Sequence, residues 1–414
     1  DRQRPILINN WEATYFDFTE EKLLTLAKTA KNLGVELFVL DDGWFGKRTT
    51  ETAGLGDWWV NRDRLPAGIS GLSAKIHDLG MMFGLWFEPE MTNKDSDLYR
   101  QHPDYIIETP NRHASQGRKQ YVLDFSRSEV VDYVYQLMAK VLREGKVDYV
   151  KWDMNRNITE CFSAASPSDQ QGEIFHRYIL GVYRLYDRLI HEFPQILFES
   201  CASGGGRFDA GMLYYAPQAW TSDDSDAIER LKIQTGTSYC YPTSSMGAHV
   251  SVSPNEQLQR QTPLKTRADV AYFGAFGYEL DLNALSTEEL AQIKRQIAFM
   301  KEHRQLFQFG TFYRLQTPFE SNIVSWLVVS PDKKHAIMGY FKILNDVNAE
   351  YRLQRIPGLN PSTEYKVKEE AGDNLGSFSG SELAKIGLVT TDASAGENKE
   401  TTDFYSKLFI FDAE

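Results

Sequence analysis

Short apolar segments alternate with helical patterns from residue 6 to about residue 303. Apolar residues recur three and four positions apart in the first helical pattern, and Gly34 is placed to end it. Eight strand and helix units favour a closed (β/α)8 barrel, a TIM barrel. A doubly wound open sheet is the alternative, but no Gly-x-Gly-x-x-Gly or phosphate-loop lysine motif opens a helix after a strand. The predicted strands are residues 6–11, 37–41, 82–87, 149–153, 197–201, 218–222, 246–250 and 276–280. The predicted helices are residues 20–33, 128–143, 173–191, 226–234, 267–273 and 286–303.

The pattern changes after residue 309. Strand-like segments separated by Pro, Gly, Asn and Asp follow one another there, and no helical run interrupts them. We therefore predict two domains, a catalytic barrel of residues 1–309 and a small antiparallel β-domain of residues 310–414, folded as a sandwich. The segments that indicate the β-domain are residues 323–329, 336–341, 365–368 and 407–411.

Composition and charge exclude several classes of protein. The hydrophobic content of 42% is ample for a packed core, and the net charge of −12 argues against a nucleic-acid partner, which needs concentrated Lys and Arg. Three scattered cysteines predict neither a disulfide framework nor a metal site. No apolar signal core follows residues 1–5, and no apolar run approaches the length of a membrane span. We expect a soluble cytoplasmic protein that binds a neutral partner.

The fourth predicted strand carries an unusual set of polar residues. Strand residues alternate faces, so Lys151, Asp153 and Asn155 are expected on one side of it. A buried ion pair that closes off the strand would be the better explanation of an isolated Lys-x-Asp. Other apolar runs, however, also end in acidic or aromatic residues, and the carboxyl ends of barrel strands build the active site. We therefore expect a pocket formed by Trp11, Asp41, Asp42, Trp86, Lys151, Asp153, Cys201 and Asp223.

Aromatic rings together with carboxylates favour a sugar ligand, because rings pack on the apolar faces of a sugar and carboxylates accept its hydroxyls. Glycoside cleavage needs two carboxyl groups, one on each side of the scissile bond. We predict that Asp153 is the nucleophile and that Lys151 keeps it ionised. Asp223 lies nearest the end of the sixth strand and is the predicted proton donor. Asp226 has the spacing of a helix cap before Glu229, which favours a structural role.

Several of these residues allow other interpretations. Asp41 and Asp42 could form a metal-binding pair, but hydrogen bonding to hydroxyls is the simpler role. The glycines of residues 203–207 could cradle a phosphate or simply allow any ligand to approach the backbone. Trp11 and Trp86 could plug the barrel instead of facing the pocket. Glu199 is a candidate for a buried partner of Lys151.

Five runs in this order resemble the microbial α-galactosidases of glycoside hydrolase family 36. The runs are LFVLDDGWFG, GLWFEPEM, YVKWDMNR, FESCASGGGRFD and WTSDDSDAIERLKIQ, and the resemblance covers nearly the whole chain. It implies a retaining melibiase that removes terminal α-linked galactose from melibiose, raffinose or stachyose without a metal or organic cofactor. It also implies that Asp153 is the nucleophile and Asp223 the acid/base. The galactose contacts that it implies are Asp41, Asp42, Trp86, Arg118, Lys151, Asn155, Cys201 and Gly204.

The resemblance leaves two alternatives to hydrolysis. A glycosyl enzyme can be intercepted by a sugar, which would make the chain a galactosyltransferase of the raffinose-synthase type. Enzymes of this family usually carry a large N-terminal β-sandwich domain that supports a tetramer, whereas this sequence starts almost at its first barrel strand. We therefore expect either a fragment or a short form, a possible homo-oligomer, and, as the second alternative, an inactive galactoside-binding module.

Overall fold

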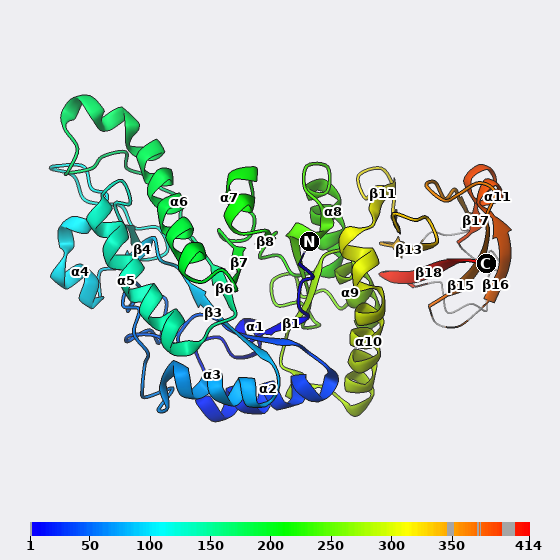
Figure 1. The fold of residues 1–414 in the computed structure, drawn as a ribbon, viewed down its shortest axis with the longest axis horizontal. Coiled ribbons are helices and arrows are strands. Elements are labelled where there is room, and N and C mark those ends of the chain that lie inside the picture. The colour runs from blue at the N-terminus through cyan, green and yellow to red at the C-terminus, as the bar shows by residue number, and fades with distance from the viewer. Residues whose placement is uncertain (1, 346–351, 371, 373, 391–401) are drawn as a thin grey trace. The chain divides into compact units, whose positions relative to one another are not determined.

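The computed structural model describes residues 2–345, 352–370, 372, 374–390 and 402–414. They group into two compact units, one of residues 7–223 and 279–286, the other of residues 1–6, 224–278 and 287–414 (Figure 1). The predicted boundary after residue 309 stays a prediction. Across the described ranges, none of the helices combines the length and the apolar content that a membrane span requires.

Eight strands form a closed barrel, which confirms the predicted fold. They are β1 (Leu7–Asn9), β2 (Leu37–Leu40), β3 (Met82–Phe87), β6 (Tyr149–Trp152), β7 (Leu197–Ser200), β8 (Gln218–Trp220), β9 (Met246–Ser251) and β10 (Ala275–Glu279). Their order around the barrel is β1-β10-β9-β8-β7-β6-β3-β2. Neighbouring strands run parallel, with Phe87 opposite Trp152 and Lys151 opposite Glu199. Strands buried on both faces consist mostly of consecutive apolar residues, so their positions could be predicted from the sequence.

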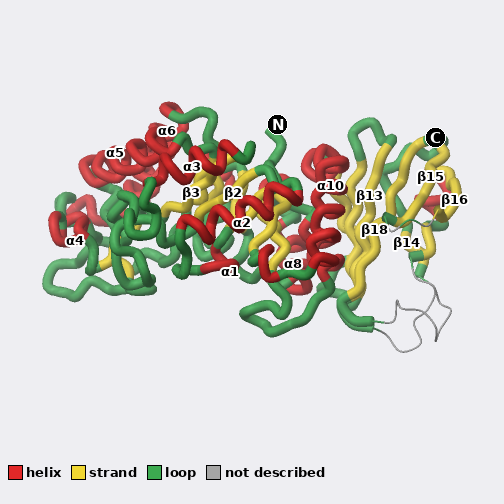
Figure 2. Tube along the Cα trace, turned by 90° about the horizontal axis from the view of Figure 1, so that it is seen from below, coloured by secondary structure: helices red, strands yellow, loops and turns green. Residues whose placement is uncertain are grey.

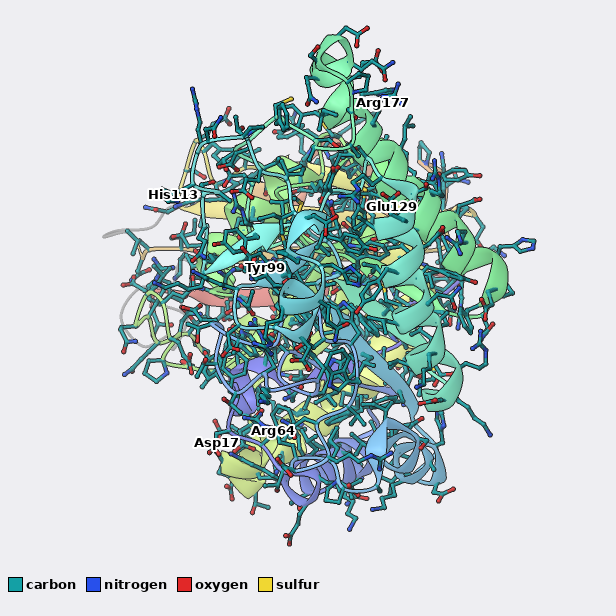
Figure 3. All side chains as sticks on the ribbon, turned by 90° about the vertical axis from the view of Figure 1, so that its left-hand side faces the viewer. Asp17, Arg64, Tyr99, His113, Glu129 and Arg177 are labelled. Carbon is teal, nitrogen blue, oxygen red and sulfur yellow. The ribbon has the colours of Figure 1, made fainter. Side chains whose placement is uncertain are left out.

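A helix follows each barrel strand. These helices are α2 (Glu20–Leu33), α3 (Gly68–Asp78), α5 (Ser128–Gly145), α6 (Ile174–Glu192), α7 (Ala210–Tyr215), α8 (Ala227–Thr237), α9 (Leu264–Ala271) and α10 (Thr287–Phe309). The Thr19 side chain accepts a hydrogen bond from the N–H of Lys22 and caps α2, and Gly34 ends it with a φ of 103°. Helices α5 and α6, marked by Glu129 and Arg177 in Figure 3, pack against each other.

Short elements extend the loops of the first unit. Helix α1 (Trp11–Thr14) follows β1, and an excursion after β3 contains the antiparallel pair β4 (Met91–Asn93) and β5 (Gln120–Val122) with helix α4 (Asp97–Gln101). The 3-10 helices of this unit are Pro103–Tyr105, Ser168–Glu173 and Leu282–Ala284, and a fourth, Thr243–Ser245, lies in the other unit. The predicted helices do not include α3, α7 or these short elements.

Strands dominate the chain after α10. Six of them form an antiparallel sheet in the order β11-β12-β13-β18-β15-β16, and β14 pairs with β17. Figure 2 labels β13, β18, β15 and β16 of this sheet. The strands are β11 (Thr311–Gln316), β12 (Ile323–Val329), β13 (His335–Lys342), β14 (Leu353–Gln354), β15 (Glu364–Glu369), β16 (Asn374–Ser379), β17 (Leu388–Val389) and β18 (Tyr405–Ala413).

One face of the six-stranded sheet forms an apolar core with a smaller second layer. Leu388 of β17 and Leu383 of helix α11 (Gly380–Lys385) belong to the same buried cluster as Leu327 and Phe409 of the sheet. The expectation of no helix in this region is therefore wrong at α11. Six residues are too few to show a helical period, but the capping box of Ser379 and Glu382 is a local signal for a helix start.

Candidate active site

The carboxyl ends of the barrel strands carry the predicted site residues. Asp41 directly follows β2, Asp153 follows β6, Cys201 follows β7, and Asp223 lies three residues after β8. All four belong to the unit of residues 7–223, and the same ends of parallel barrel strands face one loop-lined end. The structure thus places these side chains at the end of the barrel where such folds hold their active sites.

Lys151 pairs with Asp41. Its Nζ lies 2.8 Å from Asp41 Oδ2, and the Asn9 side-chain amide donates to the same oxygen at 2.7 Å. Burial opposes the charge of Lys151, but the negative groups around it, Asp41 first and Asp153 among them, raise its pKa well above the ordinary value. The direct ion pair of Lys151 is thus with Asp41, and its effect on the ionisation of Asp153 stays a prediction.

Glu199 is not the partner of Lys151 that the sequence suggested. Its carboxylate accepts hydrogen bonds from the Tyr149 hydroxyl at 2.6 Å and from the Gln218 side-chain amide at 2.5 Å. Both donors come from barrel strands, so Glu199 joins neighbouring strands inside the barrel wall. Lys151 and Glu199 lie opposite each other in the strand register, but their side chains bond to different residues.

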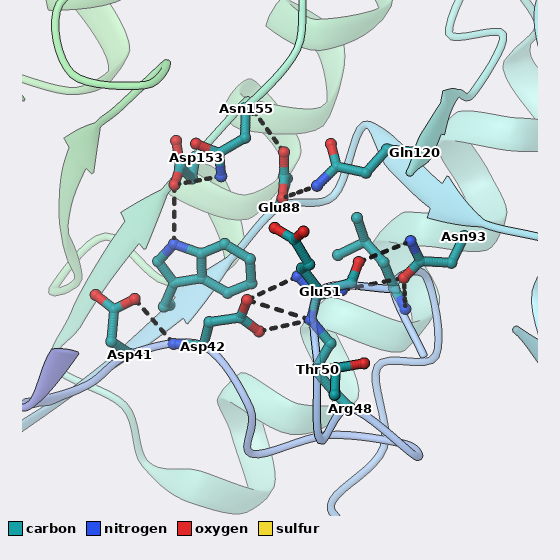
Figure 4. Close-up of polar contacts among 12 residues, drawn as sticks. Asp41, Asp42, Arg48, Thr50, Glu51, Glu88, Asn93, Gln120, Asp153 and Asn155 are labelled. Atoms are coloured by element: carbon teal, nitrogen blue, oxygen red, sulfur yellow. Dashed lines mark hydrogen bonds and ion pairs between the residues drawn. The ribbon is translucent and has the colours of Figure 1, made fainter. Parts of the chain in front are cut away.

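Asp42 forms a buried ion pair with Arg48. The guanidinium donates from Nη2 at 2.7 Å and from Nε at 2.9 Å, and it also bonds the side chain of Asn93 (Figure 4). Burial raises the pKa of Asp42 more than Arg48 lowers it. Asp41 and Asp42 thus have separate cationic partners. Within the described ranges, no cluster of three or more His, Cys, Asp or Glu side chains could hold a metal ion.

Asp153 is buried and held by three donors. Its Oδ2 accepts from Trp86 Nε1 at 3.2 Å and from Asn155 Nδ2 at 2.7 Å (Figure 4). Its Oδ1 accepts from the N–H of Met154 at 2.8 Å. Its own N–H donates to the carbonyl of Phe87 at 2.7 Å, which ties the residue to β3. These bonds fix both the backbone and the orientation of the carboxylate.

Trp86 is an element of the barrel wall whose indole edge reaches the site. Only 2% of the residue is exposed, and its ring stacks on Phe45 at a centroid distance of 6.1 Å. The backbone carbonyl of Trp86 accepts a bond from Trp44 Nε1 at 2.9 Å, which locks the strand end. Trp11 is half-buried on α1, where it makes edge-to-face contacts with Tyr15. Trp86 therefore both fills the wall and binds Asp153.

The loop after β7 packs closely against the chain after β8. Gly204 has a φ of 80°, and a Cβ on it would lie 2.6 Å from Ser222 Cα and 2.7 Å from the backbone nitrogen of Asp223. Only glycine permits both this conformation and this approach. Burial and the charge of Asp153 raise the pKa of the Cys201 thiol well above its ordinary value, so the thiol is neutral. The site thus gains a small apolar wall at Cys201.

Arg118 and Asn155 meet through a serine of this loop. Arg118 is exposed, and its Nη1 donates to Ser203 Oγ at 3.4 Å, while Ser203 Oγ donates to Asn155 Oδ1 at 3.1 Å. The two predicted sugar contacts therefore belong to one hydrogen-bonded chain that ends at Asp153.

Asp223 differs from Asp153 in its environment. It is accessible to solvent, yet neighbouring protein atoms desolvate it partly, and this desolvation and the charge of Asp153 raise its pKa above the ordinary value. Lys151 and Arg118 oppose that shift. Asp226, the competing carboxylate, accepts from the N–H groups of Ile228 and Glu229, which confirms the predicted helix cap.

Sequence reasoning missed three residues that organise this site: Asn9, Arg48 and Glu88. Glu88 is fully buried directly after β3, and it accepts a bond from the N–H of Asn155 at 2.5 Å. A glutamate next to proline after a buried apolar strand was the available signal. Arg48 and Asn9 gave no such signal, because a sequence does not show which polar groups meet.

Comparisons with known proteins agree on the relatives of this chain. The melibiase family model matches residues 1–310, and the model of the glycosyl hydrolase family 36 C-terminal domain matches residues 323–411. The chain is 53% identical over 389 residues to the α-galactosidase AgaA of Geobacillus stearothermophilus, an alignment that covers 94% of this chain and 53% of that protein. It is 46% identical over 413 residues to the α-galactosidase Mel36A of Lactobacillus acidophilus, covering 100% of this chain and 55% of that protein.

Solved structures give the same result. The crystal structure of AgaA has a TM-score of 0.96 at 51% identity and covers 100% of this chain and 56% of its own. The α-galactosidase of Lactobacillus brevis has a TM-score of 0.97 at 54% identity, with coverage of 100% and 55%. The chain thus spans about half the length of the curated relatives that it matches. The chain belongs to the melibiases of glycosyl hydrolase family 36.

Proposed function

We propose that this chain carries the catalytic machinery of a retaining α-galactosidase that removes terminal α-linked galactose from oligosaccharides of the melibiose and raffinose type. The main support is a pair of carboxyl groups, Asp153 and Asp223, at one end of a family 36 barrel. Asp153 is buried, whereas Asp223 is accessible to solvent and has a raised pKa. Relatives named α-galactosidases are 46–53% identical. Variants of AgaA have been crystallised with raffinose and with stachyose.

Under this proposal Asp153 is the nucleophile. Its carboxylate attacks the anomeric carbon while the bond to the leaving oxygen breaks, and a covalent β-galactosyl enzyme results. Its three hydrogen bonds hold it in one orientation, which lowers the entropic cost of attack.

Asp223 is then the acid/base. A raised pKa keeps a fraction of it protonated in the pH range where an ordinary aspartate is ionised, so that it can give its proton to the departing oxygen. In the second step the resulting carboxylate takes a proton from water, which attacks the galactosyl ester and releases α-galactose. Two inversions give overall retention.

The galactose contacts remain those proposed from the sequence: Trp11, Asp41, Asp42, Trp86, Arg118, Lys151, Asn155, Cys201 and Gly204. Asp41 and Asp42 would accept hydrogen bonds from sugar hydroxyls, and their buried cations, Lys151 and Arg48, keep two such carboxylates compatible with one site. Arg118, which has a long and exposed side chain, would donate to a sugar hydroxyl.

The test is hydrolysis of p-nitrophenyl α-galactoside, with the α-glucoside as the control substrate. Asp153→Asn should abolish turnover, and azide should restore part of it by replacing the nucleophile. The matched control is Asp148→Asn, which makes the same change at the opposite end of β6, where Asp148 bonds His77 and the N–H of Phe83. Activity of Asp153→Asn above a few per cent without azide would show that another residue is the nucleophile.

A second measurement tests the stereochemistry and the competing reaction. Proton NMR of the first-formed sugar should show α-galactose, and initial β-galactose would exclude double displacement. Product analysis at high concentrations of a sugar acceptor decides between hydrolysis and transfer. Asp223→Ala should lose far more activity on melibiose than on a dinitrophenyl galactoside, because an activated leaving group needs little protonation.

Three further proposals concern the protein as a whole. We propose residues 1–309 as the catalytic domain and 310–414 as the β-domain, a cytoplasmic location, and assembly into a homo-oligomer. Limited proteolysis tests the boundary, cell fractionation tests the location, and light scattering after size exclusion tests the assembly. A monomer at all concentrations would exclude the oligomer.

A further inference from the structure

A second buried carboxyl group lies beside the proposed nucleophile. Glu88 is 0% exposed at the end of β3. One of its oxygens, Oε1, accepts from the backbone N–H of Asn155 at 2.5 Å, and the other, Oε2, accepts from Gln120 Nε2 at 3.0 Å (Figure 4). Gln120 belongs to β5 in the excursion after β3, so Glu88 joins that excursion to the chain that follows β6. None of the roles proposed above uses this glutamate.

The hydrogen bonds of Glu88 lead directly to Asp153. Asn155, whose backbone Glu88 holds, donates from its side-chain Nδ2 to Asp153 Oδ2 at 2.7 Å. The other donor to that oxygen, Trp86 Nε1, is more distant at 3.2 Å. A shift of the Asn155 backbone would therefore move the shorter of the two side-chain hydrogen bonds that orient Asp153.

We propose that Glu88 is a positioning residue for the nucleophile, which it orients through the backbone of Asn155. This inference rests on the proposed function, because it gives Glu88 a role in the chemistry of Asp153. In this role Glu88 does not itself contact the substrate. Its task is to hold the Asn155 N–H, and through it the Asn155 side chain, at a fixed place.

The surroundings of Glu88 favour its neutral form. Asp153 faces it from the end of β6 and Arg48 from the loop after β2, while Asn155 and Gln120 are neutral. Burial first, and then the charge of Asp153, raise the pKa of Glu88 to about 8, although the Asn155 N–H and Arg48 oppose the shift. Glu88 is thus neutral at pH 6, and Asp153 need not share the site with a second negative charge.

Gln120 offers a place for the extra proton. Its Oε1 is buried and has no hydrogen-bond partner among the described residues. If the amide turns by 180°, a Glu88 protonated on Oε2 can donate to this Oε1. When Glu88 ionises, the amide presents Nε2 instead. In both states Oε1 of Glu88 still accepts from Asn155, so the hold on the backbone is kept.

The test compares Glu88→Gln with Glu88→Ala. Glutamine has the shape of the neutral carboxyl group and can still accept from Asn155, so kcat at pH 6 should stay within about 3-fold of the wild type. Alanine removes the acceptor, and kcat should fall about 100-fold with little change in KM, as expected for a misplaced reacting group. Glu51→Gln is the matched control, because Glu51 lies nearby in Figure 4 but is exposed.

A spectroscopic measurement reads the same contact without turnover. In protein labelled with ¹⁵N-asparagine, the backbone amide of Asn155, assigned with Asn155→Gln, should titrate with a midpoint near the value of about 8 given by Glu88. This titration should be absent in Glu88→Gln. Glu88→Ala should also move the side-chain amide resonance that reports the bond to Asp153.

The outcomes separate the two proposals. A Glu88→Ala protein with wild-type kcat and an unmoved Asn155 side-chain resonance would overturn the positioning role. So would a Glu88→Gln protein as impaired as Glu88→Ala, because a charge and not a position would then be needed. If Glu88→Ala does not fold, Glu88→Gln and the titration still decide. If the wild-type chain cleaves no galactoside, the proposed function fails. The Asn155 resonances then decide whether Glu88 positions Asn155.

Discussion

Replacing Lys151 by methionine tests which carboxylate this lysine serves. The change keeps most of the side-chain volume but leaves Asp41, 3% exposed, without its cation at 2.8 Å. Breaking a buried ion pair on one side costs about 3–5 kcal/mol. Asn9 and the N–H of Asp42 continue to donate to Asp41, so we expect a loss near the lower end, about 3 kcal/mol in the free energy of unfolding.

A double-mutant cycle assigns that loss to a partner. If Lys151 and Asp41 form the pair, the combination of Lys151→Met with Asp41→Asn should cost less than the sum of the single changes, with a coupling of about 2 kcal/mol. The combination with Asp153→Asn should show a smaller coupling, because Asp153 comes after Asp41 among the charges that raise the pKa of Lys151. Urea unfolding followed by tryptophan fluorescence measures both cycles.

The control is an exposed lysine of the same unit. Lys22 pairs with Asp17 at 3.4 Å, where the side chains are 45% and 100% exposed, so Lys22→Met should change stability by no more than about 0.5 kcal/mol. A larger coupling of Lys151 to Asp153 than to Asp41 would refute the pairing, and a Lys151→Met protein as stable as Lys22→Met would refute the cost of the buried charge.

Two further changes follow from contacts near the site. Gly204→Ala should strain the loop and displace the backbone at Asp223, so that activity falls more on melibiose than on a dinitrophenyl galactoside. Gly172→Ala, where an added Cβ meets nothing within 4 Å, should leave both activities unchanged. Arg207→Leu should lower the free energy of unfolding by about 3–5 kcal/mol, because it leaves the fully buried Glu90 without the two guanidinium bonds of 2.8 Å, and a stability within 1 kcal/mol of the wild type would contradict this.

The barrel could be predicted from the sequence because its strands are buried on both faces. Residues 82–87 form β3 as predicted, and the apolar run alone is sufficient there. Helix α3 was not predictable in the same way, since Gly68 and Gly71 weaken the helical pattern although Ile69, Leu72 and Ile76 are buried on one face. Tertiary packing, not local propensity, stabilises that helix.

The location of the candidate site could also be predicted, but its pairings could not. Barrel geometry brings the ends of the strands together, so acidic residues after several strands indicate a shared site. Alternation along a strand fixes which face Lys151 occupies, but not which carboxylate of another strand lies at the same level. For that reason the sequence favoured Asp153, two residues away, whereas the structure gives Lys151 to Asp41, 110 residues away.

The charge of Asp153 links the two halves of the proposed reaction. In the free protein that charge helps to raise the pKa of Asp223, which suits a proton donor. Once Asp153 carries the galactosyl group as an ester, its negative charge is gone. The pKa of Asp223 should then fall, which suits the base that the second step needs.

Asp153→Asn imitates this neutral state, so it should lower the midpoint at which the Asp223 carboxyl titrates. In protein labelled with ¹³C at the aspartate carboxyl groups, the Asp223 resonance, assigned with Asp223→Asn, measures this midpoint. The resonance of Asp224 is the control, because burial is the main cause of its raised pKa and Asp153 is not among the groups that shift it. An Asp223 midpoint that is unchanged or higher in Asp153→Asn would show that the charge of Asp153 does not raise the pKa of Asp223, and the link between the two steps would be refuted.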